Sequence, residues 1–352
     1  MKPLTGLTVL DFSHVIAGPL STFYLAQLGA RVIKIEQPGP GDVLRGTAKG
    51  ATQFAALNAG KDFAQIDLKS AAGRAEALAL ATTCDVLVDN FRPGGLERAG
   101  LGFKALRQVN PKLIYCAISG YGTHHAPWAQ RGAYDHVIQA ATGLSMLAGG
   151  PSDPPIKTGF PVVDVMTGVL AAFAVTAAVQ ERSRTGEGRH IDVSMWGAAL
   201  QLMYPFTVDT LATGQAPERV GNKGYSGSPA SEYFETQDGF IALGANTAGQ
   251  IVKLYPLLGW SAADAEHDLE RGAGFARARD PAAFKVKLAA ALKTNTAAHW
   301  EAVCNAQGIP AARVRDLAEF TREAVASGAL VPTQLQLGDV KISTPGLGWT
   351  CA

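Results

Sequence analysis

The sequence predicts an α/β fold in which helices cover both faces of a parallel sheet. Two observations predict it: short strands alternate with helical segments through the first third of the chain, and most of these strands are apolar runs. Hydrophobic residues make up 47% of the 352 residues and charged residues 17%, so the chain can bury a large core and is not disordered.

The first elements are assigned from apolar runs and from the residues that bound them. In order, they are a strand at 7–12, a helix at 18–28, a strand at 31–36, a helix at 71–83 and strands at 85–89 and 113–118. Gly18-Pro19 begins the first helix, because proline suits the first helical turn. Repeated strand–helix–strand units of this kind predict a Rossmann-like parallel sheet.

The rest of the chain predicts a second, smaller α+β domain. A helix from about 165 to 184 and a strand at 190–194 complete the large domain, and the composition between 213 and 233 shifts to Gly, Ser, Pro and Asn, which is typical of a linker or binding loop. A strand at 240–243 and helical spacing over 282–303 follow. The predicted division is a large domain at 1–212, a linker and small domain at 213–322, and a C-terminal segment at 323–352 that returns to the large domain.

Charge and cysteine content exclude several classes of protein. With 31 Lys and Arg against 30 Asp and Glu, the formal charge is +1, which argues against nucleic acid as the main partner. The four cysteines are too widely spaced for a zinc clip and too few for a disulfide scaffold, so we predict no metal site.

The sequence also argues against membrane insertion. The N-terminus has no signal-peptide apolar block, and the apolar stretch from Val165 to Val179 is short for a bilayer span, which favours a buried core helix. We expect a cytoplasmic protein with no membrane partner.

Two common catalytic motifs are incomplete. The first strand–helix–strand unit ends in Glu36, as a dinucleotide site does, but its turn, residues 13–19, has one glycine where G-x-G-x-x-G needs three. The segment Gly224-Tyr225-Ser226-Gly227 lacks the spacing of the G-x-S-x-G hydrolase elbow.

Asp164 is the carboxylate with the most unusual setting, between two valines at the start of a largely apolar helix. Such a residue can be a helix N-cap that accepts the first free backbone N–H groups. It can also be a nucleophile in a dry pocket that forms a covalent acyl adduct. The pattern alone favours the cap and leaves the second role open.

Eight segments in a fixed order carry a resemblance to a known family. They are residues 10–19, LDFSHVIAGP; 28–36, LGARVIKIE; 41–46, GDVLRG; 58–61, NAGK; 66–69, IDLK; 85–94, DVLVDNFRPG; 133–135, AYD; and Asp164 ahead of 184–188, RTGEG. Together they resemble the class III CoA-transferase family, the group of formyl-CoA:oxalate and carnitine CoA-transferases and related acyl-CoA racemases. The resemblance runs from about residue 4 to residue 320.

The resemblance implies a reaction. Asp164 matches the aspartate that attacks an acyl-CoA thioester, which would give an aspartyl–acyl mixed anhydride and CoA thiolate before CoA moves to a new acid. The substrates implied are coenzyme A thioesters, with succinyl-CoA as a common donor, and a small mono- or dicarboxylic acid as acceptor. No permanently bound cofactor is expected.

The resemblance also implies the residues that bind CoA. Ile16 and Ala17 match the pantetheine and thioester end. The further CoA-binding positions are Arg45, Ile66, Lys69, Asn90, Phe91, Arg92, Arg98, Tyr134 and Asp135. Phe91 offers a stacking face, and Lys69 and Arg98 can neutralise phosphate oxygens. Arg45 is included because Gln37 stands where the family often has an arginine.

A glycine-rich stretch at 221–227 matches a loop that closes over the active site in this family, with Tyr225, Ser226 and Gly227 as the substrate loop. Closure would exclude water from a mixed anhydride. The alternative is an ordinary flexible linker. Formyl-CoA transferases have Gln in place of Ile16, and Ile16 cannot hydrogen-bond a small diacid, which disfavours oxalate as acceptor.

Two other functions remain as alternatives. Racemases of this fold have a His immediately before the Asp that matches Asp135, whereas this chain has Tyr134 there and His136 on the other side. A tyrosine, with a pKa near 10, is a poor base for an α-proton, which favours the transferase. A non-catalytic CoA-binding homologue is the third candidate, and the presence of Asp164 argues against it. The resemblance further implies an interlocked homodimer.

Overall fold

The computed structural model describes residues 2–47, 50–123, 127–270, 272 and 274–350, which form two compact units. The larger unit comprises the described residues of 1–147, 155–217 and 331–352, and the smaller unit those of 148–154 and 218–330. The units therefore divide at 217/218 and 330/331, later in the chain than the 212/213 and 322/323 of the sequence analysis.

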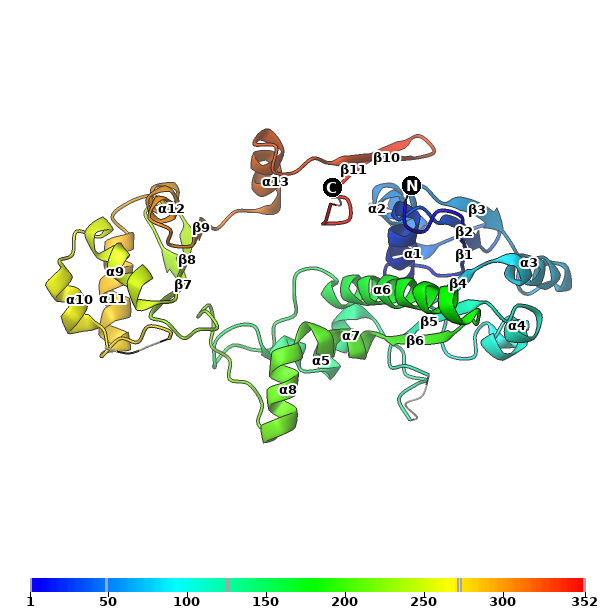
Figure 1. The fold of residues 1–352 in the computed structure, drawn as a ribbon, viewed down its shortest axis with the longest axis horizontal. Helices are drawn as coiled ribbons and strands as arrows, with labels where there is room; N and C mark the ends of the chain where they lie inside the picture. The colour runs from blue at the N-terminus through cyan, green and yellow to red at the C-terminus, as the bar shows by residue number, and fades with distance from the viewer. Residues whose placement is uncertain (1, 48–49, 124–126, 271, 273, 351–352) are drawn as a thin grey trace. The chain divides into compact units, whose positions relative to one another are not determined.

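The larger unit is built on a six-stranded sheet in which every neighbouring pair of strands is parallel (Figure 1). Its strands are β1 (Thr8–Asp11), β2 (Arg31–Glu36), β3 (Asp62–Gln65), β4 (Val86–Asp89), β5 (Ile114–Ser119) and β6 (His190–Ser194). The strand order is β3-β2-β1-β4-β5-β6, so the order reverses between β1 and β4. The predicted α/β fold with a parallel sheet is confirmed.

Helices connect these strands and flank the sheet. They are α1 (Ala17–Gln27), α2 (Gly50–Asn58), α3 (Ala71–Thr83), α4 (Phe103–Val109), α5 (Asp135–Ala141), α6 (Val162–Thr185), α7 (Met195–Leu202) and α8 (Tyr204–Thr213), with the 3-10 helices η1 (Val43–Gly46), η2 (Glu97–Ala99) and η3 (Leu144–Met146).

The two faces of the sheet have separate cores. Val9 of β1 packs in a cluster with buried residues of α1 and α6, and the next residue, Leu10, packs with buried residues of α3 and α4. Successive side chains of a strand point to opposite faces, so an apolar residue at both positions requires a cover on both sides. This is the reason that the strands read as continuous apolar runs.

Helix α6 is a core helix by its packing. It is long and apolar enough to cross a membrane by length and composition, but Ala171, Val175 and Ala178 are buried in the cluster between α6 and the sheet. It begins at Val162, ahead of the predicted 165, and ends before Gly186, whose φ of 73° lies in the left-handed region that suits a helix C-terminus.

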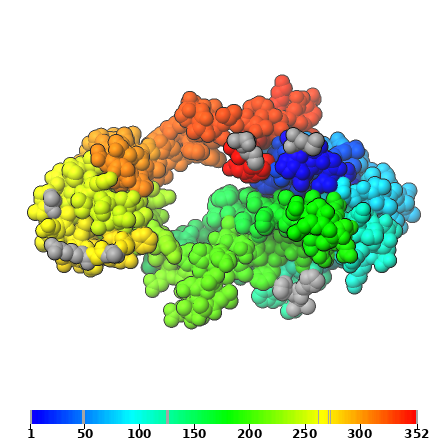
Figure 2. All heavy atoms as spheres, viewed as in Figure 1, coloured from blue at the N-terminus to red at the C-terminus, as the bar shows by residue number. Residues whose placement is uncertain are grey.

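The smaller unit is an α+β body with its own core. Its antiparallel sheet has the order β7-β8-β9, with β7 (Ala230–Glu235), β8 (Phe240–Ala245) and β9 (Ala311–Arg313). Its helices are α9 (Ala248–Leu257), α10 (Ala262–Asp268), α11 (Pro281–Leu292), α12 (Ala297–Ala306) and α13 (Leu317–Ala326). Phe234, Leu254 and Trp300 belong to one buried cluster of this unit. Figure 2 shows the unit as a body coloured yellow and orange.

The helical character predicted over 282–303 is confirmed. The helical spacing over 282–303 is two helices, because α11 ends at Leu292 and a new N-cap follows. The hydroxyl of Thr296 accepts the backbone N–H of His299 at 3.2 Å, which starts α12 in a new direction.

The chain returns to the larger unit with a hairpin of β10 (Thr333–Leu337) and β11 (Val340–Thr344). Ile342 of this hairpin is buried in one cluster with Ala55 of α2 and with Ala59, which directly follows that helix. Helix α13 belongs to the smaller unit, so the return begins at Val331 and not at 323.

Candidate active site

Asp164 lies in the first turn of α6 and lines a cavity of about 330 Å³ in the larger unit. Ile16 and Ala17, at the start of α1, line the same cavity. The two helix N-termini meet because α1 packs along α6, and Gly168, one turn after Asp164, allows a close approach. A Cβ at Gly168 would lie 2.9 Å from the carbonyl oxygen of Ala17.

Asp164 is not the cap of its helix, because Asp135 has that role. The backbone N–H groups of Val163 and Asp164 donate to Oδ2 of Asp135, at 2.7 and 3.0 Å, and Gln139 donates to its other oxygen. The cap interpretation of Asp164 is therefore wrong. Its own carboxylate is not needed to satisfy the first N–H groups of α6.

The surroundings of Asp164 raise the pH at which its carboxyl group loses its proton. Burial, followed by the negative charge of Asp135, raises the pKa of Asp164 to about 7. A carboxylate of this pKa is a better base and nucleophile than an ordinary aspartate, and both protonation states are populated at neutral pH.

The CoA-binding residues predicted near the adenosine and phosphates line a second cavity of about 520 Å³. These are Ile66, Lys69, Phe91 and Arg98. A third cavity, of about 250 Å³, shares Phe91 with both of the others. The three cavities follow the carboxyl ends of β2, β1 and β4, around the point where the strand order reverses, which is the usual ligand position in open α/β sheets.

Several other predicted residues lie in the cavity of Asp164. Arg92 and Tyr134 line it, and so does Asn90. The amide of Asn90 is already engaged, because its Oδ1 accepts the backbone N–H of His14 at 2.9 Å and its Nδ2 donates to the carbonyl of His14 at 2.7 Å. Asn90 thus holds the turn that leads to Ile16.

Arg45 is engaged with the protein itself. Its Nε and Nη2 donate to the carboxylate of Glu36 at 3.1 and 2.8 Å, and its guanidinium lies 3.7 Å from the centroid of the Phe54 ring. Glu36 lines the second and third cavities, so Arg45 forms an ion pair with a residue that faces them.

The predicted substrate loop belongs to the smaller unit and is hydrogen-bonded there. The hydroxyl of Ser226 donates to Asn246, and Nη1 of Arg277 donates to the carbonyl of Ser226 at 3.0 Å. Gly227 has a φ of 65°, which favours glycine, and Tyr225 is exposed. The role of this loop stays a prediction.

Sequence reasoning missed two residues of the site. His14 lines the cavity of Asp164 and the third cavity, its ring lies 5.5 Å from that of Phe91, and burial lowers its pKa, which keeps the ring neutral at pH 7. Arg131 also lines the cavity of Asp164. The available signal was proximity: His14 lies two residues before Ile16, and Arg131 lies three before Tyr134.

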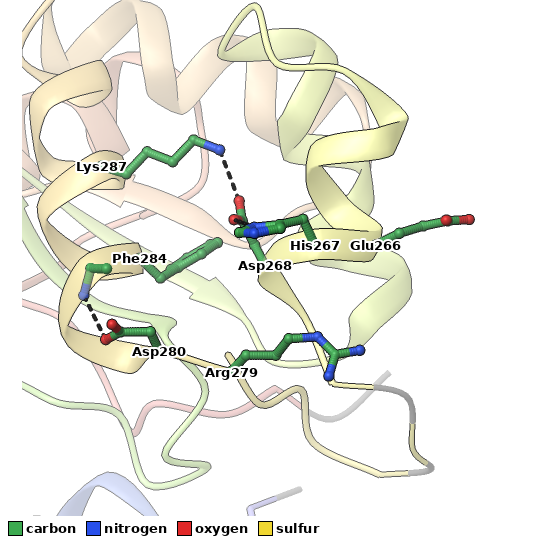
Figure 3. Close-up of a pocket in the computed structure, with 8 residues that line it drawn as sticks. Glu266, His267, Asp268, Arg279, Asp280, Phe284 and Lys287 are labelled. Carbon is green, nitrogen blue, oxygen red and sulfur yellow. Dashed lines mark hydrogen bonds and ion pairs between the residues drawn. The ribbon is translucent and has the colours of Figure 1, made fainter.

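A separate cavity of about 540 Å³ lies within the smaller unit, and two of its charged residues, Asp268 and Lys287, form an ion pair (Figure 3). Asp268 accepts from Nζ of Lys287 at 2.8 Å, and Asp280 caps α11 by accepting the N–H of Ala283 at 2.9 Å. Among the described residues, no group of three or more His, Cys, Asp or Glu side chains could hold a metal ion. The half-buried carboxylate of Asp164 therefore marks the stronger candidate site.

Comparisons with known proteins identify the family of the chain. The model of CoA-transferase family III matches residues 4–349. The acetyl-CoA:oxalate CoA-transferase of Acetobacter aceti is 36% identical over 322 residues, 90% of this chain and 82% of that protein. The succinate–glutarate CoA-transferase of Agrobacterium fabrum is 34% identical over 335 residues, 90% of this chain and 81% of that protein.

A solved structure supports the same assignment. The crystal structure of a CAIB/BAIF family protein from Brucella suis matches with a TM-score of 0.81 at 30% identity, over 98% of this chain and 95% of that one. The resemblance drawn from the eight segments is thus confirmed over nearly the whole length. The chain belongs to CoA-transferase family III and is an enzyme of that class.

Proposed function

We propose that this enzyme moves CoA from an acyl-CoA to a carboxylic acid through a mixed anhydride at Asp164. The observation that carries the proposal is the position of Asp164, a half-buried carboxylate at a helix N-terminus. Its cavity shares Phe91 and His14 with the third cavity, at the carboxyl ends of the strands. A covalent acyl adduct needs a nucleophile that an acyl-CoA can reach while water is scarce.

The bond changes balance as follows. A carboxylate oxygen of Asp164 attacks the thioester carbonyl, and the C–S bond breaks to give the anhydride and CoA thiolate. The thiolate attacks the aspartyl carbonyl, which releases the donor acid and leaves an aspartyl–CoA thioester. The acceptor carboxylate displaces the thiolate to form a second anhydride, and the thiolate attacks the acceptor carbonyl to give the new acyl-CoA and free Asp164.

Two helix N-termini support this chemistry. No side chain caps α1 at Ile16, and the positive end of a helix dipole stabilises negative charge that develops on a tetrahedral intermediate. The raised pKa of Asp164 supports nucleophilic attack in the ionised form.

For the acids exchanged, we propose short dicarboxylates. Arg92 and Arg131 line the cavity with Asp164, and a guanidinium binds a free carboxylate well. The relatives named above act on oxalate, succinate and glutarate. A panel of oxalate, succinate, glutarate and matched monocarboxylates against succinyl-CoA, read by the mass of the product CoA ester, tests this class. Equal rates for the monocarboxylates would contradict it.

The covalent step is tested by oxygen transfer. With an acceptor labelled with ¹⁸O in both carboxylate oxygens, the bridging oxygen of the second anhydride remains on Asp164 when the thiolate attacks the acceptor carbonyl. Peptide mass spectrometry after turnover is therefore expected to find ¹⁸O in Asp164, and hydroxylamine is expected to trap a hydroxamate at the same residue.

The matched control is Asp164→Asn, which keeps the shape of the side chain and removes the nucleophile. It is expected to lower kcat by at least about 10³-fold, as removal of a catalytic nucleophile does. Turnover without label in Asp164, or full activity in Asp164→Ala, would reject the mechanism.

Racemisation gains no support from the site. His136 is exposed, and its ring is stacked with that of Tyr134, at 6.3 Å between centroids. Incubation with a branched acyl-CoA in deuterated water is expected to leave the α-position unlabelled in the absence of an acceptor acid. Substantial deuterium at the α-position would favour racemisation over CoA transfer.

We also propose that the enzyme is a homodimer, as the family resemblance implies. Helix α8 exposes Tyr204, Val208 and Leu211, and apolar side chains gathered on one helix favour burial against another chain. Sedimentation equilibrium is expected to give twice the chain mass of 36.8 kDa. A monomer at micromolar concentration would contradict it.

A further inference from the structure

The turn between β1 and α1 contains a residue in an unfavourable backbone conformation. Val15 has a φ of 68°, which is a true outlier for a β-branched side chain. Such conformations persist where the surrounding contacts hold them, and they cluster at functional sites. Ile16 and Ala17 follow Val15 directly and line the cavity of Asp164.

We propose that a buried ion pair between Lys34 and Asp42 holds Val15 in this conformation and so sets the position of Ile16 and Ala17 relative to Asp164. Lys34 and Asp42 are positioning residues, and their role rests on the transfer reaction proposed above. Both residues line the third cavity and neither lines the cavity of Asp164, so a loss of kcat with little change in KM for the acyl-CoA is what distinguishes an effect through the turn from a direct contact with CoA.

Asp42 holds the turn at the N–H group of Val15. Its Oδ1 and Oδ2 accept this N–H at 3.2 and 3.3 Å. The same carboxylate accepts the N–H of Leu44 at 3.0 Å as the N-cap of η1, and the N–H of Asp42 donates to Glu36 at 3.0 Å. Because Asp42 is anchored on both sides, it cannot follow the turn if Val15 relaxes.

Lys34 holds the same turn at Ser13, two residues before Val15. Its side chain rises from β2 and is fully buried, and its Nζ lies 3.1 Å from Oδ2 of Asp42. The same Nζ donates to the carbonyl of Ser13 at 2.7 Å. With Asn90 on both backbone groups of His14, three successive residues of the turn are held by side chains from outside it.

A change of φ at Val15 would move the site. Rotation about its N–Cα bond turns the chain that follows relative to Ser13, so Ile16 and Ala17 would shift relative to Asp164. Transfer to a carboxylate nucleophile requires alignment within about 1 Å, and misplacement on that scale costs on the order of 100-fold in rate.

The test uses the fact that glycine adopts a positive φ without strain. Asp42→Asn is expected to lower kcat on the order of 10- to 100-fold, with a much smaller change in KM for the acyl-CoA. In a chain that also carries Val15→Gly, the same Asp42→Asn change is expected to cost less than about 5-fold, because a glycine in place of Val15 needs no carboxylate to stay left-handed.

A second pair of variants separates positioning from stability. Asp42→Asn leaves the ammonium of Lys34 buried without its partner and is expected to lower Tm. Lys34→Met/Asp42→Asn removes both charges and is expected to recover Tm but not kcat. Adding Val15→Gly to that double variant is expected to recover kcat, which keeps the test valid if Asp42→Asn alone does not fold.

Crystal structures give a readout that does not depend on the reaction. The φ of Val15 is expected to become negative in Lys34→Met/Asp42→Asn. If it stays near its present value, or if Val15→Gly does not recover kcat, or if kcat returns together with Tm in the double variant, the positioning role is overturned. Absence of CoA transfer by the unmodified enzyme would instead reject the proposed function, while the φ readout still decides whether the ion pair holds the turn.

Discussion

Two carboxylates lie at the first turn of α6, and each has a different position. Asp135 caps the helix, and Asp164 lines the cavity. Asp135 accepts the N–H groups of Val163 and Asp164, and its charge contributes to the raised pKa of Asp164. A capped helix lets the neighbouring carboxylate point to a cavity instead of to the backbone. Asp135, the cap, and Asp164, the proposed nucleophile, are therefore coupled through their charges.

This coupling predicts the pH dependence of the reaction. In the mechanism proposed above only the ionised form of Asp164 attacks, so kcat/KM is expected to rise as pH increases through about 7 and to level above it. In Asp135→Asn the like charge is gone, so the apparent pKa is expected to fall. Profiles of kcat/KM from about pH 5 to 9 check both expectations, and an unchanged midpoint in Asp135→Asn would contradict the coupling.

The raised pKa of Asp164 also predicts that its ionised carboxylate lowers the free energy of unfolding. The pKa of Asp164 is about 7 in the folded chain against an ordinary value of 3.8, so the folded state binds its proton more tightly, and stability falls as pH rises between these values. Asp164→Asn is expected to raise the free energy of unfolding by about 2 kcal/mol at pH 8, and to have almost no effect near pH 4.

Urea denaturation at the two pH values measures this difference. The control is Asp339→Asn, in the exposed turn between β10 and β11, which is expected to change neither value. A destabilised Asp164→Asn at pH 8 would show that the charge is favoured in the folded state.

At the scale of elements, the site depends on how closely α1 and α6 approach. Gly168 faces the carbonyl of Ala17 and the side chain of Leu20, at 2.9 and 3.1 Å from an added Cβ. The first of these distances is shorter than real Cβ contacts allow. The helices must separate to admit any side chain at this position, and the residues at both N-termini would shift with them.

Gly168→Ala is therefore expected to destabilise the chain by about 1–2 kcal/mol, although alanine favours helices, and to lower kcat several-fold. The matched control is Gly249→Ala in α9, where an added Cβ meets no described atom within 4 Å. That change is expected to be neutral or stabilising. Thermal unfolding and kcat of both variants give the comparison, and equal effects would remove the packing argument.

At the scale of the molecule, the two compact units each have their own buried residues. The cavities at the sheet edge belong to the larger unit, and the buried cluster around Leu254 and Trp300 belongs to the smaller one. A ligand stabilises the structure that binds it, by an amount set by its concentration relative to Kd.

CoA at 100 times its Kd is expected to stabilise the larger unit by about 2.7 kcal/mol. Hydrogen exchange is expected to slow in β1, β4 and β5 and to change little in α9 and α11. Lys69→Ala, at the second cavity, is expected to weaken this protection without affecting exchange in the absence of CoA. Equal protection in the smaller unit would contradict the assignment of the CoA site.

Much of the fold could be predicted because its signals are local. Residues 31–36, 71–83 and 190–194 occupy the elements expected of them, since apolar runs and bounding glycines act over a few residues. The spacing over 282–303 also predicted helix correctly, but the break between α11 and α12 depends on the cap at Thr296, which apolar spacing does not indicate.

The site was predicted less completely. Segment order pointed to Asp164, Ile16, Ala17 and Phe91, and the structure brings these residues to one cavity. The order of the segments did not reveal that Asp135 caps α6, that Arg45 pairs with Glu36, or that His14 and Arg131 line the cavity. Each of these facts is a contact between segments that sequence spacing does not relate.

By itself, then, the sequence determined the α/β class, the order of the elements and the family, because periodicity and motif order are properties of neighbouring residues. Only the tertiary structure decided which carboxylate caps α6 and which is free to react. It also decided the pKa of Asp164 and the strained turn at Val15. These depend on burial and on charges brought together from distant parts of the chain, and no local pattern records them.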